Sequence, residues 1–389
     1  MKTQVVIVGA GPSGLLLSLL LNRAGIESMI LERATREHVL GRIRAGVLES
    51  GTVQTLREAC VHERMDREGM LHNGCYLTDD NLMVHIDFHE LTGKQLMVYG
   101  QTEVTADLYA AHDAIGTSIV HSVEDVQIHA PDQSRSFVEY TVNSKRERID
   151  CLYIAGCDGF HGVCRKTIPQ QHRTEYERVY PFGWLGVLSR TPPASRELIY
   201  ANSKHGFALA SMRNENLSRY YLQVPVSDKV EDWSDERFWQ ELKKRLPADV
   251  AQVMAVDQSI EKSIAPLRSF VCEPLRFGNL FLVGDAAHIV PPTGAKGLNL
   301  AVADVVYLHE ALIDAIKNKR FTGIDEYSKR ALSRIWKTMR FSWQMTTMLH
   351  RFDDEDSFAS QMRKASLKHL AESETARREL AENYTGLPY

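Results

Sequence analysis

The chain has 389 residues, enough for a sizeable core in two or three domains of roughly 100–200 residues each. Its 46 basic and 50 acidic side chains give a formal net charge of −4, which argues against a broad basic surface for nucleic acid or an anionic membrane. The six cysteines show neither a CxxC pair nor zinc-ligand spacing, so we expect reduced thiols in a cytoplasmic protein and no metal site.

The first 32 residues have the pattern of a βαβ unit. Val5–Val8 is a β-branched strand, a leucine-rich helix follows to about Ala24, and Ser28–Leu31 is a second strand that runs into Glu32. Glycines interrupt the apolar run between strand and helix, which favours a buried strand and helix over a signal or membrane segment. We therefore expect an α/β fold that opens with a Rossmann-like parallel sheet.

The turn between this strand and helix carries a dinucleotide-binding pattern, Gly9-x-Gly11-x-Ser13-Gly14. Glycines allow backbone N–H groups at a helix N-terminus to approach a pyrophosphate, whose charge the helix dipole favours. Glu32 lies about 20 residues further on, where a carboxylate accepts hydrogen bonds from a ribose. A glycine-rich turn without a ligand is the plainer alternative, and the motif alone does not separate FAD from NAD.

Strand character recurs at Cys151–Ala155, just before Asp158-Gly159, and the pattern then changes to alternating strands separated by polar turns. These strands, at Glu197–Ala201, Phe207–Arg213 and Ser218–Pro225, indicate an antiparallel sheet. Side chains alternate between the faces of a strand, so groups able to bind a carboxylate should share faces. One face should carry Phe207, Leu209, Ser211 and Arg213, with Arg219 and Tyr221 together on the next strand and Tyr200 on the strand before. Solvated strand residues remain the open alternative.

Two more motifs follow in Leu280–His288 and Pro291–Asn299. Asp285 ends a strand, where it can bind a second ribose, and Gly294 and Gly297 let a helix N-terminus face a flavin edge. From about residue 297 the pattern is mostly helical, with Trp336 and Trp343 as expected core anchors. We expect an FAD-binding domain at 1–178 to which 265–300 returns, an inserted β-sheet substrate domain at 179–264, and a helical interface region at 301–389.

Taken together, these motifs resemble the single-component flavoprotein aromatic hydroxylases, in particular those that act on 4-hydroxybenzoate. The resemblance runs nearly end to end, through Gly9–Leu17, Leu40–Glu49, Val98–Val104, Ile154–Gly162, Val179–Gly186, Ser263–Phe270, Gly284–Leu300 and Ala381–Tyr389. It implies hydroxylation of 4-hydroxybenzoate to 3,4-dihydroxybenzoate with FAD, a reduced nicotinamide and O2, through a flavin C4a-hydroperoxide. It also implies aromatic compound degradation, and a homodimer is expected.

The resemblance also assigns roles to residues. Ser211, Arg213 and Tyr221 match the substrate carboxylate clamp, Tyr200 and Tyr384 the pair that activates the phenol, Pro292 the carbonyl beside it, and His72 the end of a proton network. Lys296 matches a source of positive potential. The FAD contacts implied are Gly9, Gly11, Ser13, Gly14, Glu32, Arg42, Arg44, Gln101, Asp158, Arg219, Asp285, Leu298 and Asn299.

For the nicotinamide cofactor the resemblance implies Arg33, His38, Arg42, His161 and Arg268. Relatives committed to NADPH often carry Gln and Tyr where this chain has Ala34 and His38. Arg33, Arg36 and a cationic His38 can still hold a 2′-phosphate, so NADPH is favoured and NADH stays open. The alternative activity is that of a sister hydroxylase acting on a dihydroxybenzoate or an aminobenzoate.

Overall fold

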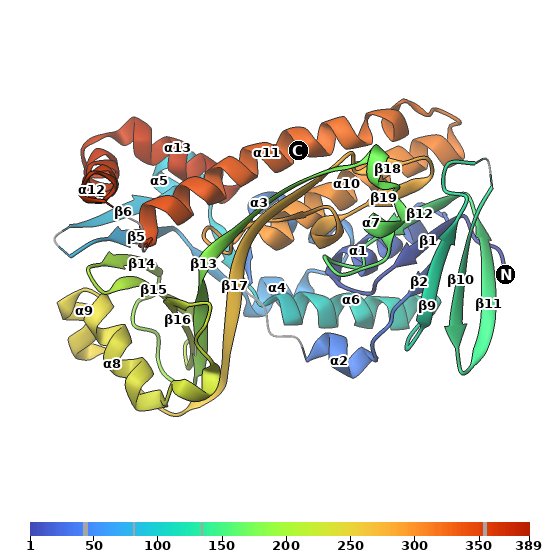
Figure 1. The fold of residues 1–389 in the computed structure, drawn as a ribbon. Helices are drawn as coiled ribbons and strands as arrows, with labels where there is room; N and C mark the ends of the chain where they lie inside the picture. The colour runs from blue at the N-terminus through green and yellow to red at the C-terminus, as the bar shows by residue number, and fades with distance from the viewer. Residues whose placement is uncertain (42–45, 81, 134, 353–355) are drawn as a thin grey trace.

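The computed structural model describes the chain except residues 42–45, 81, 134 and 353–355. Its first part is built on a six-stranded sheet in the order β18-β19-β12-β1-β2-β8, in which every neighbouring pair except β18–β19 is parallel (Figure 1). The strands are β1 (Val5–Val8), β2 (Ser28–Leu31), β8 (Ile119–Val120), β12 (Tyr153–Gly156), β18 (Arg276–Phe277) and β19 (Leu280–Leu282).

The βαβ unit expected at the start of the chain is confirmed. All four residues of β1 are buried, as a β-branched strand with parallel neighbours on both sides requires, because helices cover both faces of such a sheet. Helix α1 (Pro12–Arg23) contacts both α6 (Gln101–Ile115) and α10 (Gly297–Lys317). A separate antiparallel sheet of β9 (Glu124–His129), β10 (Ser136–Val142) and β11 (Lys145–Cys151) precedes β12.

The second part is an eight-stranded sheet in the order β20-β17-β13-β16-β15-β14-β5-β6. Two long strands, β13 and β17, run from this sheet toward the first part of the molecule (Figure 1). The antiparallel strands expected from the sequence are confirmed as β14, β15 and β16. Bounds are β5 (Gly74–Thr78), β6 (Met83–Asp87), β13 (Thr174–Ser189), β14 (Leu198–Ser203), β15 (Gly206–Asn214), β16 (Leu217–Pro225), β17 (Ser259–Glu273) and β20 (His288–Ile289).

This sheet extends beyond the 179–264 segment. Strand β5 pairs in parallel with β14, which adds a hairpin from residues 74–87 to the sheet edge. The sequence of a short strand does not indicate which distant strand it pairs with. The pairing of this hairpin with β14 was therefore not predicted. Both β13 and β17 also reach past the expected boundaries.

The two faces of the eight-stranded sheet have different covers. Helices α8 (Asp235–Arg245) and α9 (Ala248–Val253) cover one face, where Tyr220, Leu222 and Phe238 pack together. On the other face, Tyr200 and Leu209 pack with residues of the helical C-terminal part, in the same cluster as Tyr384. This part comprises α11 (Thr322–Leu349), α12 (Ser357–Glu372) and α13 (Glu374–Thr385), as the helical pattern predicts (Figure 1).

The prediction that Trp336 and Trp343 anchor the core is wrong. Their side chains are 39% and 45% exposed. The two residues are seven apart and so lie on the same side of α11, whereas the core-facing side carries Tyr327, Ala331 and Ile335. Both tryptophans therefore face outward from an amphipathic helix. The residue type alone did not indicate this orientation.

The remaining elements are short. Strands β3 (Val47–Leu48), β7 (Leu96–Val98) and β4 (Met70–His72) form a small sheet. The other helices are α2 (Arg36–Leu40), α3 (Ser50–Glu58), α4 (Glu63–Glu68), α5 (Phe88–Thr92), α7 (Cys164–Thr167) and the 3-10 turns η1 (Gln170–His172), η2 (Val230–Asp232) and η3 (Gly284–Ala286). In the described ranges, no helix has both the length and the apolar character to cross a membrane.

Candidate active site

The predicted nucleotide-binding residues follow the carboxyl ends of β1, β2, β12 and β19. Parallel strands place these ends at one edge of the sheet, which is where open α/β sheets bind ligands. Backbone hydrogen bonds tie the loops together, from Gly9 N–H to Leu31 O at 2.8 Å and from Cys157 N–H to Val8 O at 2.8 Å. A Cβ added to Gly284 would lie 3.2 Å from Ser13 Oγ, so η3 adjoins the glycine-rich turn.

The glycine-rich turn has the shape that a pyrophosphate needs. A Cβ on Gly14 would lie 2.0 Å from Gly9 O, so this glycine is required for the approach of helix and turn. By contrast, no atom of the described residues lies within 4 Å of a Cβ added to Gly11 or Gly297, both at helix N-termini. Open space above Gly11 and at the start of the 21-residue helix α10 fits an anionic cofactor group.

The acidic residues at this edge differ in what they already bind. Glu32 accepts hydrogen bonds from Ala10 N–H at 2.7 Å and Ala34 N–H at 2.8 Å, and its remaining lone pairs are available to a ribose. Asp158 accepts from Cys164 N–H at 2.9 Å, while its other carboxylate oxygen is buried without a partner among the described residues. Burial raises the pKa of Asp158. An orphaned buried oxygen fits a hydrogen bond from a bound cofactor.

Further predicted FAD contacts are positioned in different ways. Asp285 is exposed in η3, and Gln101 begins α6. The side chain of Asn299 is fully engaged, because it accepts from Glu49 N–H at 2.9 Å and donates to Val47 O at 2.9 Å. Only backbone groups of Asn299 and Leu298, in the first turn of α10, are therefore left for a flavin. Arg42 and Arg44 lie outside the described residues.

Strand register brings the predicted substrate residues together on one face. Tyr200 pairs with Leu209, and Leu209 with Tyr221, so these three side chains form a row across β14, β15 and β16. Ser211 pairs with Arg219 in the adjacent row. Residues directly opposite in a sheet point to the same side, so hydroxyls and a guanidinium share this face.

A pair of buried tyrosine hydroxyls marks this face. The hydroxyl of Tyr200 is hydrogen-bonded to that of Tyr384 on α13, and each residue is 1% exposed. Burial raises the pKa of Tyr200, although its hydrogen bonds with Tyr384 and with Gly294 N–H oppose the rise. The pKa of Tyr384 is also raised by burial and by the neighbouring Tyr200. Both phenols are therefore protonated at neutral pH, and their hydroxyls are joined by a hydrogen bond.

The loop that contains Pro292 lies beside these tyrosines. Gly294 has a φ of +102°, and a Cβ there would lie 2.8 Å from the ring of Phe341, so glycine is required at this point. Pro292 is exposed, and its carbonyl accepts a hydrogen bond from Ala295 N–H at 2.9 Å. A carbonyl has two lone pairs, so this oxygen retains capacity for a second donor.

Arg213 lies at an irregularity in β15. The pairing between β15 and β16 shifts between Met212 and Asn214, which makes Arg213 the extra residue of a β-bulge. Bulges redirect a side chain and interrupt strict alternation, so the expected shared face with Ser211 does not follow from register here. Arg213 is half-buried, and no described carboxylate pairs with it. Arg219, in contrast, is 5% exposed and forms an ion pair with Glu261.

His72 is buried at 3% exposure on β4, and neither ring nitrogen has a hydrogen-bond partner among the described residues. Burial lowers its pKa, while the charge of Glu197 opposes that effect. Ordered water is the usual partner of such a buried polar group. A neutral imidazole with two open positions can therefore both accept and donate a proton through water.

The structure also contains an ionic network that the sequence did not reveal. Lys296 donates to Glu49 at 2.6 Å and to the carbonyl of Tyr384 at 2.8 Å. Arg334 also pairs with Glu49, at 3.2 Å. Glu49 and Lys296 lie within motifs noted from the sequence, but Arg334 is one of several arginines along an amphipathic helix, and no local pattern marks it.

The residues predicted for the nicotinamide cofactor fall into two groups. Arg33 and His38 are exposed near α2, where Arg36 forms an ion pair with Asp113 at 2.6 Å. His161 is exposed, and Arg268 lies 4.4 Å from the ring of Phe160. Within the part of the chain that the structure describes, no hydrogen bond, ion pair or ring contact joins the two groups.

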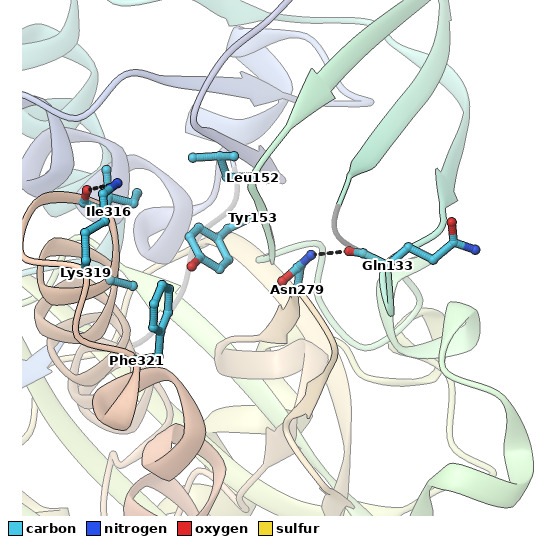
Figure 2. A pocket seen from close by; sticks show the side chains of 8 residues that line it. Gln133, Leu152, Tyr153, Asn279, Ile316, Lys319 and Phe321 are labelled. Carbon is cyan, nitrogen blue, oxygen red and sulfur yellow. Dashed lines mark hydrogen bonds between the residues drawn. The ribbon is translucent and has the colours of Figure 1, made fainter.

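A surface pocket of about 280 Å³ lies elsewhere (Figure 2). Tyr153 and Phe321 line it, and Asn279 closes one side by donating a hydrogen bond to Gln133 O at 2.8 Å. Tyr153 begins β12 and Asn279 precedes β19, so this pocket lies at the amino ends of the strands, opposite the nucleotide edge. Across the described residues, no group of His, Cys, Asp and Glu could hold a metal ion.

Comparison with known proteins agrees with this geometry. The family model described as "FAD binding domain" matches residues 2–342. The chain is 51% identical over 394 residues to p-hydroxybenzoate hydroxylase of Acinetobacter baylyi, covering 100% of this chain and 96% of that protein. It is 26% identical to para-nitrophenol 4-monooxygenase of a Pseudomonas strain, covering 83% and 81% of the two chains. The crystal structure of p-nitrophenol 4-monooxygenase from Pseudomonas putida shares the fold, with a TM-score of 0.84, 18% identity and 100% of each chain covered.

Proposed function

This chain belongs to the FAD-binding family of flavoprotein aromatic monooxygenases, and we propose that its site hydroxylates 4-hydroxybenzoate to 3,4-dihydroxybenzoate. The buried hydroxyl pair of Tyr200 and Tyr384, on the sheet face beside the Pro292 loop, carries this proposal. A substrate phenol has an ordinary pKa of about 10, and its ring reacts with an electrophilic oxygen only when the phenol is ionised. The site must therefore remove that proton.

Bound FAD would supply the redox chemistry, by accepting hydride from the nicotinamide and activating dioxygen. Gly11 and the α10 N-terminus would hold its anionic groups, and Glu32, Asp158 and Asp285 would hold its hydroxyl and N–H groups. These assignments are supported by the open space above Gly11 and by the orphaned oxygen of Asp158.

The chain's own residues would bind and orient the ring. Arg213 has no described ion-pair partner, so its guanidinium is available for the substrate carboxylate, with Ser211 and Tyr221 nearby in the sheet. The opposite end of the ring would place its phenol against Tyr200. From there the proton would pass to Tyr384 and through water to His72, without opening the site to bulk solvent.

NADPH is the electron donor that we propose. Arg33 and His38 are exposed and available near the end of β2, whereas Arg36 is already paired with Asp113 and stacked on Tyr109. Arg33 and His38 would therefore hold the 2′-phosphate. The test compares the rate of hydride transfer to the flavin from NADPH with the rate from NADH, at equal concentrations of the two donors.

We also propose a cytoplasmic homodimer. Dependence on a reduced nicotinamide supports a cytoplasmic location, and all six cysteines are free thiols. Trp336 and Trp343 are exposed on the same side of α11, and exposed aromatic side chains of this size favour a protein contact. Light scattering of the purified protein would give its mass in solution.

The test of function uses the purified protein with 4-hydroxybenzoate and NADPH. We expect flavin absorbance, substrate-dependent oxygen uptake and 3,4-dihydroxybenzoate as product. A parallel panel of 2,4-dihydroxybenzoate and 4-aminobenzoate tests whether another aromatic acid is the better substrate. A preparation without flavin, or one that oxidises NADPH and never hydroxylates a ring, would refute the proposal.

A further inference from the structure

Three buried charged side chains form a cluster behind the tyrosine pair, here called the Glu49 triad: Glu49, Lys296 and Arg334. Their side chains are 5%, 3% and 7% exposed. Each carboxylate oxygen of Glu49 has its own cation, with Lys296 Nζ at 2.6 Å from Oε1 and Arg334 Nη2 at 3.2 Å from Oε2. One carboxylate is thus shared by two basic groups, and with all three side chains ionised the triad carries a net charge of +1.

Arg334 also binds the segment that follows α13. Its Nη1 donates to Leu387 O at 2.6 Å and to Pro388 O at 3.0 Å, and its guanidinium lies 4.8 Å from the ring centroid of Tyr389. Gly386 lies against Glu49, because a Cβ there would be 2.3 Å from Oε2, and its φ is +103°. A single guanidinium therefore contacts two carbonyls, an aromatic ring and a carboxylate. Arginine can make all of these contacts because its planar group carries several donors and stacks on aromatic rings.

The triad is connected to the tyrosine pair through Lys296. Its Nζ donates to the carbonyl of Tyr384 at 2.8 Å and lies 5.5 Å from the ring centroid of Tyr384, whose hydroxyl bonds that of Tyr200. Lys94 contributes a third cation near the triad, because its Nζ donates to Gly386 O at 2.9 Å. Cys75 and Tyr221 are further titratable groups near Tyr200, and burial raises the pKa of the Cys75 thiol, so this thiol stays neutral.

The charge of Lys296 depends on what surrounds it. Burial lowers its pKa, the carboxylate of Glu49 raises it, and the guanidinium of Arg334 lowers it again. Arg334 itself cannot lose its proton under ordinary conditions. Removing Arg334 takes one positive charge from the cluster: ionised Glu49 and Lys296 would then cancel each other, and Lys94 would be the cation that remains at this end.

We propose that Arg334 is a positioning residue of the hydroxylating site: it shares Glu49 with Lys296 and clamps residues 386–389, which fixes Tyr384 against Tyr200 and keeps a net positive charge behind the substrate phenol. The inference rests on the proposed function, since it concerns ionisation of the phenol bound there. Arg334 need not touch the substrate. It would act through Glu49, Lys296 and the backbone of Tyr384.

The test compares the wild type with Arg334→Gln, Arg334→Lys and Arg340→Gln. Arg340 lies on the same helix and forms an exposed ion pair with Glu379, so its variant removes the same charge from the surface. Two quantities are measured in the FAD-loaded enzymes: the pH midpoint at which bound 4-hydroxybenzoate gains phenolate absorbance, and the fraction of oxidised NADPH that yields hydroxylated product rather than hydrogen peroxide.

We expect Arg334→Gln to raise the midpoint by about one pH unit and to increase hydrogen peroxide at the expense of product. Arg334→Lys keeps the charge, so its pH midpoint should lie close to that of the wild type. Arg340→Gln should have the same midpoint and the same product yield as the wild type. If Arg334→Gln does not retain FAD, Tyr389→Ala, which removes the ring under the guanidinium, should raise peroxide release in the same way.

Two results would overturn the inference. One is a wild-type midpoint and coupling in Arg334→Gln, whatever its melting temperature, because a residue that only stabilises the fold would behave in this way. The other is an equal shift in Arg340→Gln. Failure of the proposed function would look different, because then the wild type itself would neither ionise nor hydroxylate 4-hydroxybenzoate.

Discussion

The hydroxyl of Tyr200, in the middle of a β-sheet, is hydrogen-bonded to the hydroxyl of Tyr384, which lies 184 positions later on a helix. Neither side chain has access to bulk water. The bond therefore joins the sheet face that carries the proposed substrate residues to the helical part of the molecule.

The first prediction concerns this pair. Tyr200→Phe removes the hydroxyl that we propose relays the substrate's proton to Tyr384, and it leaves the nucleotide edge unchanged. We expect normal FAD content and continued NADPH oxidation, with ring hydroxylation reduced roughly 10²-fold and hydrogen peroxide formed instead. Tyr220→Phe is the control, because Tyr220 is buried on the opposite face of the same sheet. Unchanged coupling in Tyr200→Phe would contradict the assigned role.

The second prediction concerns Arg213. Replacing it with Ala should weaken 4-hydroxybenzoate binding by about 2–5 kcal/mol, the scale of truncating one partner of a desolvated charge pair. Binding of phenol, which has no carboxylate, should change little. Arg190→Ala, at an exposed position after β13, serves as the control. Dissociation constants follow from flavin fluorescence titrations, and an unchanged value for 4-hydroxybenzoate would remove Arg213 from the clamp.

The third prediction separates two glycines of one turn. The methyl of Gly11→Ala meets no atom of the described chain within 4 Å, so we expect a normal melting temperature but reduced FAD content, because the methyl would occupy the space proposed for the pyrophosphate. Gly14→Ala would place a methyl 2.0 Å from Gly9 O and should destabilise the fold by about 1–3 kcal/mol or more. Flavin absorbance relative to protein and thermal melts of the flavin-free forms measure the two effects. Full flavin content in Gly11→Ala would argue against a cofactor at that turn.

The fourth prediction is a pH dependence of stability. His350 is completely buried and accepts a hydrogen bond from Trp184 Nε1 at 2.7 Å, and burial lowers its pKa from 6.5 to about 3. Below pH 6.5 the unfolded chain takes up a proton at this residue and the folded chain does not. This contribution to stability is therefore complete above pH 6.5 and falls, by about 1.4 kcal/mol per pH unit, as the pH decreases toward 3.

Urea unfolding of the wild type and His350→Gln at pH 7, 6 and 5 measures this effect. The variant starts less stable, but its free energy of unfolding should fall less steeply with decreasing pH. Buried His72 and His112 and half-buried His309, whose pKa values are also lowered by desolvation, contribute equally to both proteins. Exposed His89→Gln should follow the wild type. Parallel slopes for wild type and His350→Gln would show that His350 is protonated in the fold.

Local patterns predicted the fold where local chemistry determines it. The β-branched run at Val5–Val8, the glycines after it and Glu32 predicted the nucleotide edge. Alternation put Leu209 and Ser211 on one face of their strand, and the structure places Leu209 in a row with Tyr200 and Tyr221. Alternation failed at Arg213, because a bulge depends on how a neighbouring strand pairs. The exposure of Trp336 and the joining of β5 to β14 likewise depend on distant partners.

The Glu49 triad is a further feature that local sequence patterns could not predict. Glu49 and Arg334 are 285 positions apart, and each residue type is common in helices and at strand ends. Only the folded chain brings them together. Long-range polar contacts of this kind leave no periodicity in a sequence, so they are found from structure.

Because α13 begins at Glu374 and the last strand, β20, ends at Ile289, the ribosome synthesises the strands of all four sheets before it makes the helix that carries Tyr384. A nascent chain can therefore form its nucleotide fold while the tyrosine in β14 still has no partner and its apolar surroundings are uncovered. Productive oxygen transfer would then be a late event in biogenesis. Partly synthesised chains would be a source of exposed hydrophobic surface rather than of partial enzyme.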